Sequence, residues 1–283
     1  MVCVKSILAC QGHSYQNRPC HSRRSSGLHK AGFINGLDGH LEILLRHDHR
    51  PLYVKKLFDW LNTLYSNHFV KPQFDRVGQG CEFNSPRYID VSGSRIYLGD
   101  RVHITALRDK PVRLAVFPTE DGQGSIRIGN YCTVNPGVRI TSASAIEIGD
   151  SCMIAMNAYL SDADWHDIHH RIYAPGRSAP IRLEKNVWIG DSAFITKGVT
   201  IGENSVVGAY SVVSKDVPAN SIVVGNPARV IRELDTSHLT TREHLFTSLG
   251  DYDEFQSDHF KQQLKNNRLW KWFRFLLMPG VND

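Results

Sequence analysis

The sequence predicts an all-β chain in which short parallel strands stack as a solenoid, with short helical segments at both ends. One observation behind this prediction is an aliphatic side chain at every sixth position of the clearest block: Leu183, Ile189, Ile195, Ile201, Val207 and Val213. Neither the 3.6-residue period of a helix nor the two-residue alternation of a sandwich strand sustains a period of six. Stacked strands joined by tight corners do sustain it, and three such units complete one coil.

Two further observations support the same fold. A small or aliphatic partner stands two residues before each repeat position, and both members of a pair are expected to point inward: Ile181, Val187, Ala193, Val199, Ser205 and Ser211. Glycine directly follows three repeat positions, as Gly190, Gly202 and Gly208. A corner at these places requires a residue that tolerates positive φ or the close approach of another backbone segment.

The same period continues upstream and sets the limits of the solenoid. It occurs in two further blocks, which are Ile128, Val134 and Ile140, then Ile148, Ile154 and Leu160. Less regular repeats occur at Ile96/Leu98, Val102/Ile104 and Leu114/Val116. We therefore expect the solenoid over residues 76–232. The register slips by two residues at 143–145, and the period is absent from 161 to 180. The latter stretch is interpreted as an inserted loop. An ordinary β-sandwich with accidental spacing is the alternative.

The two ends of the chain differ from the repeat region in composition. Residues 1–50 are rich in His, Arg, Ser and Gly without an apolar pattern, which predicts a disordered extension. A metal-binding arm is the alternative, because the segment holds six histidines. Apolar residues from 52 to 65 follow helical spacing, so 51–75 is expected to form a helical cap over the first coil.

Residues 233–283 are expected to form a C-terminal helical extension that is basic and aromatic. Cations recur through its last part, as Lys261, Lys265, Arg268, Lys271 and Arg274, among leucine, tryptophan and phenylalanine side chains. Such a helix either packs on the solenoid or a neighbouring subunit, or makes peripheral contact with a membrane surface.

The bulk composition narrows the classes of function. A net charge of +5 over 283 residues does not suggest a nucleic-acid partner. The six cysteines include no Cys-x-x-Cys pair, so neither a zinc site nor a disulfide framework is expected. Cys132 and Cys152 fall on inward positions, where a thiol serves as a small hydrophobe. With neither a signal-peptide core nor a membrane-spanning stretch evident, we expect a cytoplasmic location, or one at the inner face of the membrane.

The inserted loop is the best candidate for catalysis. Residues 161–171 contain three histidines and three aspartates within eleven positions. A neutral imidazole can take a proton from a hydroxyl nucleophile and return it to a leaving group. A solvated polar loop without a catalytic role is the alternative.

The chain resembles the hexapeptide-repeat acyltransferases, particularly the galactoside and maltose acetyltransferases and the polysaccharide O-acetyltransferases. The resemblance is carried by Asn-Val-Trp-Ile-Gly at 186–190, Gly-Val-Thr-Ile-Gly at 198–202, Ser-Lys-Asp-Val-Pro at 214–218 and Gly-Asn-Pro-Ala-Arg-Val-Ile-Arg at 225–232. It implies a left-handed parallel β-helix, a homotrimer, and acetyl-CoA as co-substrate in a groove between subunits, with no metal. The implied reaction acetylates a sugar hydroxyl, for example in a surface-polysaccharide or lipopolysaccharide precursor.

The resemblance also implies roles for individual residues. His166 is the implied general base, with His169 as the other choice, and Asn135 and Trp188 are implied to bind the acceptor. Backbone N–H groups near Gly190 and Asp191 are expected to stabilise the oxyanion. Ala143 stands where the family has an acceptor-binding aspartate, a departure from galactoside-like specificity. The residues implied to hold the cofactor are Asp191, Ala209, Ser214, Lys215, Arg229 and Arg232.

Rival functions come from other classes. A metal hydratase of the γ-carbonic-anhydrase type would use His166, His169 and His170 as ligands. Those residues are bunched in one loop, whereas that family draws its ligands from successive coils. Serine acetyltransferase is a second alternative, although residues 1–75 are too short for the long helical domain of that family. A non-catalytic scaffold is the third.

Overall fold

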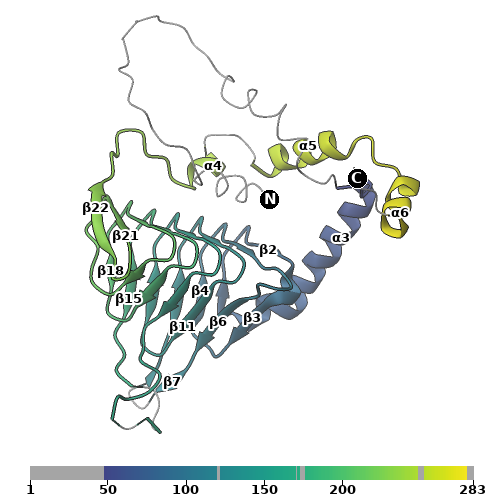
Figure 1. Cartoon of the computed structure of the whole chain (residues 1–283). Helices are drawn as coiled ribbons and strands as arrows, with labels where there is room; N and C mark the ends of the chain where they lie inside the picture. The colour runs from purple at the N-terminus through teal and green to yellow at the C-terminus, as the bar shows by residue number, and fades with distance from the viewer. Residues whose placement is uncertain (1–47, 120–121, 170, 173–175, 248–251, 279–283) are drawn as a thin grey trace, which may run out of the picture. The chain divides into compact units, whose positions relative to one another are not determined.

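The chain winds as a triangular parallel β-helix in which each coil adds one strand to each of three sheets (Figure 1). The computed structural model describes residues 48–278, apart from 120–121, 170, 173–175 and 248–251. The predicted disordered extension, up to residue 47, lies outside the described residues. Asp48–Gly280 forms one compact unit of the chain.

The three sheets contain strands of two to five residues, in agreement with the six-residue repeat. Sheet 1 has the order β1 (Arg76–Val77), β4 (Ile96–Leu98), β9 (Ile126–Ile128), β12 (Ile146–Ile148), β15 (Ile181–Leu183) and β18 (Thr200–Ile201). Sheet 2 has the order β2 (Glu82–Asn84), β5 (His103–Thr105), β10 (Thr133–Val134), β13 (Met153–Ile154), β16 (Trp188–Ile189), β19 (Val206–Val207), β21 (Ser221–Val224) and β22 (Arg229–Glu233). Sheet 3 has the order β20 (Val212–Val213), β17 (Phe194–Thr196), β14 (Tyr159–Ser161), β11 (Arg139–Ser142), β6 (Val112–Val116) and β3 (Ile89–Ser92).

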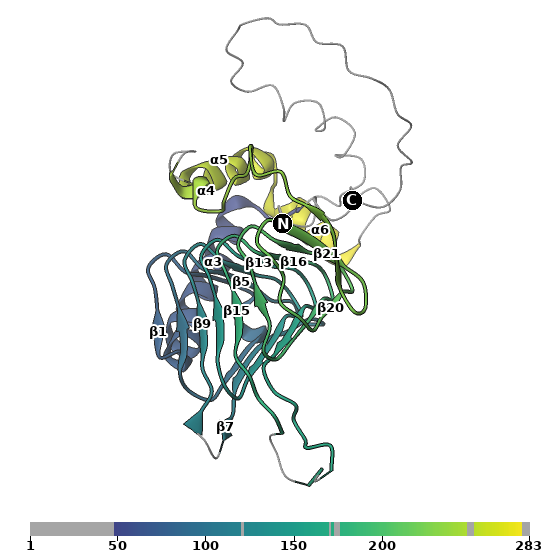
Figure 2. The same cartoon turned by 90° about the vertical axis from the view of Figure 1, so that its left-hand side faces the viewer.

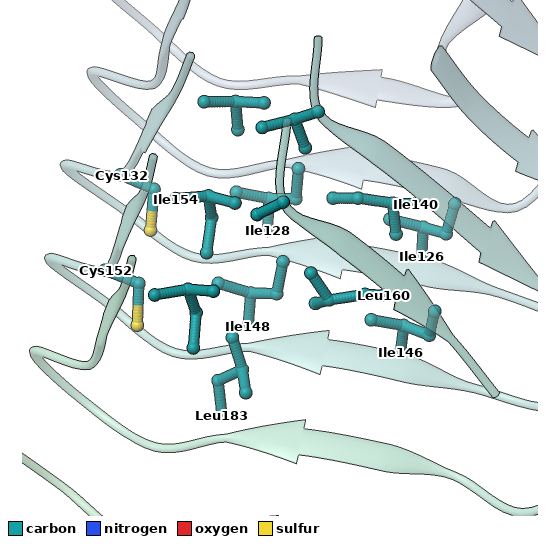
Figure 3. Packing of buried hydrophobic residues seen from close by; sticks show 14 of the residues in the cluster. Ile126, Ile128, Cys132, Ile140, Ile146, Ile148, Cys152, Ile154, Leu160 and Leu183 are labelled. Atoms are coloured by element: carbon teal, nitrogen blue, oxygen red, sulfur yellow. The ribbon is translucent and has the colours of Figure 1, made fainter. Parts of the chain in front are cut away.

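The repeat positions form columns of identical or similar side chains inside the prism. In sheet 1, Ile128 pairs with Ile148, which pairs in turn with Leu183. Figure 3 shows these side chains stacked coil on coil, together with the sulfur atoms of Cys132 and Cys152. Burial raises the pKa of the Cys132 thiol well above its usual range, which suits a thiol used as a hydrophobe. The predicted inward positions are confirmed, since each is buried.

Two inward positions of the last coils are serines, and their hydroxyls form hydrogen bonds inside the solenoid. Ser205 Oγ donates to the Pro218 carbonyl (2.7 Å) and accepts from the Ser221 amide (3.1 Å). Ser211 Oγ accepts from the amide of Gly225 at 3.0 Å. Hydrogen bonds inside the protein therefore replace those that each of these buried hydroxyls would make with water.

The corners show which of the two glycine roles applies. A Cβ on Gly190 would stand 2.6 Å from the Val207 carbonyl oxygen, so glycine allows two coils to approach. The positive φ falls two residues later, on Ser192 (φ 56°) and, in the next coils, on Asn204 and Tyr210. Close approach, and not positive φ, explains the glycine after the repeat position.

A helix precedes the first coil, as the apolar spacing predicts. Helix α3 spans Leu52–Tyr65 and is followed by a π-helix (Ser66–Val70) and a 3-10 helix (Lys71–Gln73). Within α3 only Val54 is buried, so most of its apolar side chains do not cap the core as expected. Val70 and Phe74 close that end instead, because they are buried and belong to the core cluster.

The last strand ends the regular coil. β22 pairs antiparallel with β21, and all five of its residues are exposed. The chain then returns along the corner between sheets 1 and 2, where Arg242 Nε donates to the Tyr131 carbonyl (2.8 Å) and the ring of Phe246 lies 5.5 Å from that of Tyr131. It continues through α4 (His244–Thr247), α5 (Tyr252–Leu264) and α6 (Leu269–Leu277).

The C-terminal helices end beside the helix that begins the described chain. Lys55 Nζ lies 4.1 Å from the centre of the Phe260 ring, and Leu264 is buried. The predicted C-terminal helical segments therefore pack at the first-coil end of the solenoid (Figure 1). No described helix has the length and apolar character that a membrane crossing requires.

Candidate functional site

Two insertions leave the solenoid at the same corner, where the chain passes from sheet 3 to sheet 1. One is a hairpin after β6, made of β7 (Pro118–Thr119) and β8 (Gly122–Gln123). The other is the histidine loop, residues 162–180, which follows β14. Only β11 separates β6 from β14 in sheet 3, and both insertions project from the same edge of the prism (Figures 1 and 2).

The root of the histidine loop is fixed by a buried carboxylate. Asp162 is fully buried, and it accepts hydrogen bonds from Ser142 Oγ (2.6 Å), the Ala143 amide (2.7 Å) and the Ser144 amide (3.0 Å). These partners belong to the corner where the sequence register slips by two residues. The longer corner thus supplies the amides that hold the carboxylate in place.

Backbone pairing closes the neck of the loop. Ala163 and Ser178 form an antiparallel bridge, and the Asp164 amide donates to the Arg177 carbonyl at 2.9 Å. Lys197 Nζ, from the next coil, binds the Asp164 carboxylate at 2.6 Å. The loop therefore begins and ends on the solenoid with a defined geometry.

An aromatic contact joins the two insertions. The rings of Phe117 and Trp165 meet edge to face with centroids 5.0 Å apart. Trp165 Nε1 also donates to Ser161 Oγ at 3.1 Å. Phe117 directly precedes the hairpin, and Trp165 directly precedes His166. The packing of these two rings therefore holds the start of the hairpin against the segment that carries His166.

The histidines themselves face outward. His166 and His169 are exposed, and the His169 amide donates to Asp167 Oδ1 at 2.8 Å. No partner to the His166 ring is present among the described residues. His170 lies outside the described residues. The His166 ring is therefore available to accept a proton from a bound ligand.

Ser214 and Lys215 lie at the corner of the histidine loop. Both are exposed and follow β20, which is separated from β14 by β17 alone. With strands spaced about 4.8 Å apart, the strand ends that carry Ser214 and the loop lie roughly 10 Å apart. The structure thus brings these two cofactor candidates close to the base of the loop.

A second group of predicted residues lies along the corner between sheets 2 and 3. Asn135, Asp191 and Ala209 follow β10, β16 and β19, so they stack at the ends of strands in one sheet. Asn135 Nδ2 donates to the Ile154 carbonyl at 2.8 Å, as a corner residue does. Asp191 Oδ1 accepts from Ser192 Oγ at 2.6 Å.

Sheet 2 carries the remaining predicted residues on its outer face. Trp188 is 41% exposed and stands between Met153 and Val206 of the adjacent strands, so it does not pack into the core. Arg229 pairs with Val224 near the same corner, whereas Arg232 pairs with Ile222 three residues further along β22. Both arginines are exposed.

The expected oxyanion donors need one correction. The Gly190 N–H is not available, because it donates to the Val207 carbonyl at 2.8 Å in the ladder between coils. The Asp191 N–H donates to no acceptor within the described residues, and of the expected pair it alone is free.

The arrangement separates the base from most acceptor and cofactor candidates within one chain. The five positions from Asp191 to Thr196 correspond to about 16 Å of extended strand, so sheet 3 lies between the two corners.

Sequence reasoning missed the hairpin of β7 and β8, the contact between Phe117 and Trp165, and the structural role of Asp162. Only the lost repeat between Val116 and Ile126 could have indicated the hairpin. No group of side chains suited to a metal ion occurs within the described ranges.

Comparisons with known proteins agree with the fold. Residues 180–215 match the model described as bacterial transferase hexapeptide (six repeats). A galactoside O-acetyltransferase of Escherichia coli (strain K12) is 43% identical over 113 residues, which cover 39% of this chain and 55% of that protein. The chain therefore spans about half the length of this relative. A galactoside O-acetyltransferase of Lactococcus lactis subsp. lactis (strain IL1403) is 27% identical over 188 residues, covering 66% and 75%.

Among solved structures, a maltose O-acetyltransferase from Clostridium difficile 630 aligns with a TM-score of 0.41 and 26% identity, covering 67% of this chain and 91% of that one. The six-residue period builds the parallel coils, and its most regular block coincides with the matched repeat. Over residues 180–215 the chain is similar to the bacterial hexapeptide transferases, and over a longer stretch it is similar to galactoside O-acetyltransferases.

Proposed function

We propose that the protein is an O-acetyltransferase that moves an acetyl group from acetyl-CoA to a hydroxyl of a sugar, such as a precursor of a surface polysaccharide or lipopolysaccharide. The observation that carries the proposal is the exposed His166 on a loop with a fixed root, beside Ser214 and Lys215. The similarity to galactoside O-acetyltransferases supports the choice of a sugar hydroxyl. The proposed site of action is the cytoplasm.

The proposed reaction is direct transfer between two bound substrates. His166 takes the proton of the acceptor hydroxyl while that oxygen forms a bond to the thioester carbonyl carbon. The Asp191 N–H stabilises the negative charge on the carbonyl oxygen. The carbon–sulfur bond then breaks, and the CoA thiolate receives the proton from the imidazolium. No covalent acyl-enzyme forms.

Cations and small residues suit the cofactor. CoA carries a pyrophosphate and a 3′-phosphate, for which Lys215, Arg229 and Arg232 supply exposed positive charge. Ala209 offers little bulk beside the thin pantetheine arm, and Trp188 forms a wall of the acceptor pocket. Each assignment follows the motifs of the family and the exposure of these side chains.

The separation of the two corners supports a homotrimer with shared sites. The loop of one subunit would then face the sheet 2–3 corner of its neighbour, which brings His166 to Asn135 and Asp191. Sedimentation should report about three times the mass of 32.0 kDa. A mixture of His166→Ala and Arg229→Ala subunits should recover part of the activity, because His166 and Arg229 lie at different corners of one chain. A fully active monomer would contradict the shared site.

The histidines provide the sharpest test of the chemistry. His166→Ala should lose at least about a hundredfold in turnover, because general-base assistance contributes that much or more, while acetyl-CoA affinity stays unchanged. His169→Ala is the matched control, since it removes an equally exposed imidazole from the same loop. Thiol release from acyl-CoAs against a panel of glycans reports turnover and identifies the acceptor. An inactive His169→Ala beside an active His166→Ala would assign the base to His169.

A further inference from the structure

Helix α6 has one face that is packed against the rest of the described chain. Phe275 and Trp272 are partly buried, and the Phe275 ring lies 4.4 Å from the ring of His49. Just before the helix, Asn267 Nδ2 donates to the carbonyls of Asp48 and Arg50. The orientation of α6 is therefore set by contacts on this face.

The opposite face of α6 is apolar and exposed. At about 100° per residue, five of its side chains fall within a sector of roughly 120° that excludes Trp272 and Phe275. Their exposed fractions are 42% for Leu269, 78% for Trp270, 45% for Phe273, 54% for Leu276 and 80% for Leu277. Met278, directly after the helix, is 74% exposed. We call these five helical residues the outer face of α6.

The charged residues of α6 and of the ten positions before it have a single sign. Arg274 lies beside the outer face on the helix, whereas Lys271 lies on the side turned away from it, and both are exposed. Lys265 and Arg268 precede the helix. No acidic residue occurs between Asp258 and Asp283 in the sequence. An apolar stripe with neighbouring cations is the pattern of a helix that lies in the interface of an anionic membrane.

A comparison with α3 favours lipid over protein as the partner of α6. Helix α3 also exposes a row of apolar side chains, including Tyr53, Leu57 and Trp60. However, its Lys55 binds Asp59 at 2.5 Å within the helix, so charges of both signs are present. Helix α6 itself contains no acidic residue, and Trp270, which is 78% exposed on the outer face, suits the boundary between headgroups and acyl chains.

We propose that the outer face of α6 docks the protein on the surface of an anionic lipid bilayer. The five apolar side chains enter the boundary between headgroups and acyl chains, and the basic side chains meet lipid phosphates. The packed face keeps the helix attached to the first-coil end of the solenoid. This inference concerns an interaction surface and does not depend on the transferase reaction proposed above.

Vesicle binding by the full-length protein tests the proposal. Wild-type protein should sediment with vesicles that contain phosphatidylglycerol and much less with pure phosphatidylcholine. Trp270→Ser/Leu277→Ser should weaken binding by roughly tenfold or more, because two large apolar side chains no longer leave water. Val230→Ser/Ile231→Ser is the matched control, since these exposed apolar residues lie on β22. It should bind as the wild type does.

A second pair of variants tests the charge. Arg268→Glu/Arg274→Glu should lose about fivefold or more in affinity for anionic vesicles per cation replaced, with little effect on neutral ones. Arg76→Glu/Arg182→Glu makes the same change of charge on the outer face of sheet 1 and should leave binding intact. Circular dichroism checks that each variant is folded.

Three outcomes would overturn the proposal. Wild-type protein that ignores anionic vesicles rules out the docking surface. Equal binding to both kinds of vesicle rules out the role of the cations. If sedimentation instead shows an oligomer that Trp270→Ser/Leu277→Ser dissociates, without vesicle binding, the outer face contacts a second copy of the chain.

Discussion

Replacing Asp162 by Asn should destabilise the protein although it removes only a charge and one acceptor. The Asp162 carboxylate is fully buried and accepts from the Ser142 hydroxyl and the Ala143 and Ser144 amides. The amide group of Asn presents one oxygen in place of two, so its NH2 must face one of these donors. The local geometry therefore leaves at least one buried donor without an acceptor.

The magnitude follows from the hydrogen bonds that change. A bond to a charged group contributes about 1.5–3 kcal/mol, and a buried donor left unpaired costs about 1–3 kcal/mol more. Together these changes predict a loss of about 3–5 kcal/mol in the free energy of unfolding. Asp164→Asn is the matched control, because it makes the same change two residues later. The Asp164 carboxylate is 45% exposed in its bond to Lys197, so the expected loss is at most about 1 kcal/mol.

Urea unfolding of both variants at one pH measures the difference, provided that the slopes agree. Hydrogen exchange at the Ala143 and Ser144 amides detects fraying of the loop root without global unfolding. Turnover of folded Asp162→Asn should fall as well, since this root positions His166. Equal stabilities of the two variants, with equal exchange at both amides, would refute the assigned role of Asp162.

The remaining predictions concern the cofactor, pH and the core. Lys215→Ala/Arg229→Ala should weaken CoA binding steeply and dephospho-CoA binding less; equal losses by calorimetry would place both residues away from the 3′-phosphate. The hydrogen bond from His103 holds the pKa of the Glu82 carboxyl below its usual range. That stabilisation is present above the ordinary carboxyl pKa of about 4.3 and is lost as pH falls through the lower folded value, so Glu82→Gln should be less stable at neutral pH, with the gap closing in acid. A gap that is independent of pH in urea titrations would exclude this contribution. Ile140→Ala, at a fully buried position, should lose about 2–5 kcal/mol in urea unfolding, and a loss below this range would mean that the coil collapses around the cavity.

The fold could be predicted because the repeat records burial directly. Positions such as Ile128, Ile148 and Leu183 are buried in every coil, and no other regular structure sustains that period. The helix at Leu52–Tyr65 was also predictable, but apolar spacing does not reveal whether an apolar side chain meets a core or stays exposed. Its side chains are therefore more exposed than expected.

The site could be predicted only in part. The histidine loop was visible as a gap in the repeat, whereas Asp162 looked like one of several acidic residues in that loop. Its burial depends on amides from the preceding coil, which no local pattern records. The Gly190 N–H was misassigned for a related reason, since its acceptor, Val207, lies one coil further along.

Because both insertions leave the prism at one corner, their lengths are independent of the coils. The hydrogen bonds between β6, β11 and β14 continue across the bases of the hairpin and of the loop without a change of register. Segments 117–125 and 161–180 can therefore lengthen, shorten or be exchanged between proteins while the scaffold stays the same. We expect acceptor preference to be transplantable with these two segments, moved together so that the contact between Phe117 and Trp165 is kept.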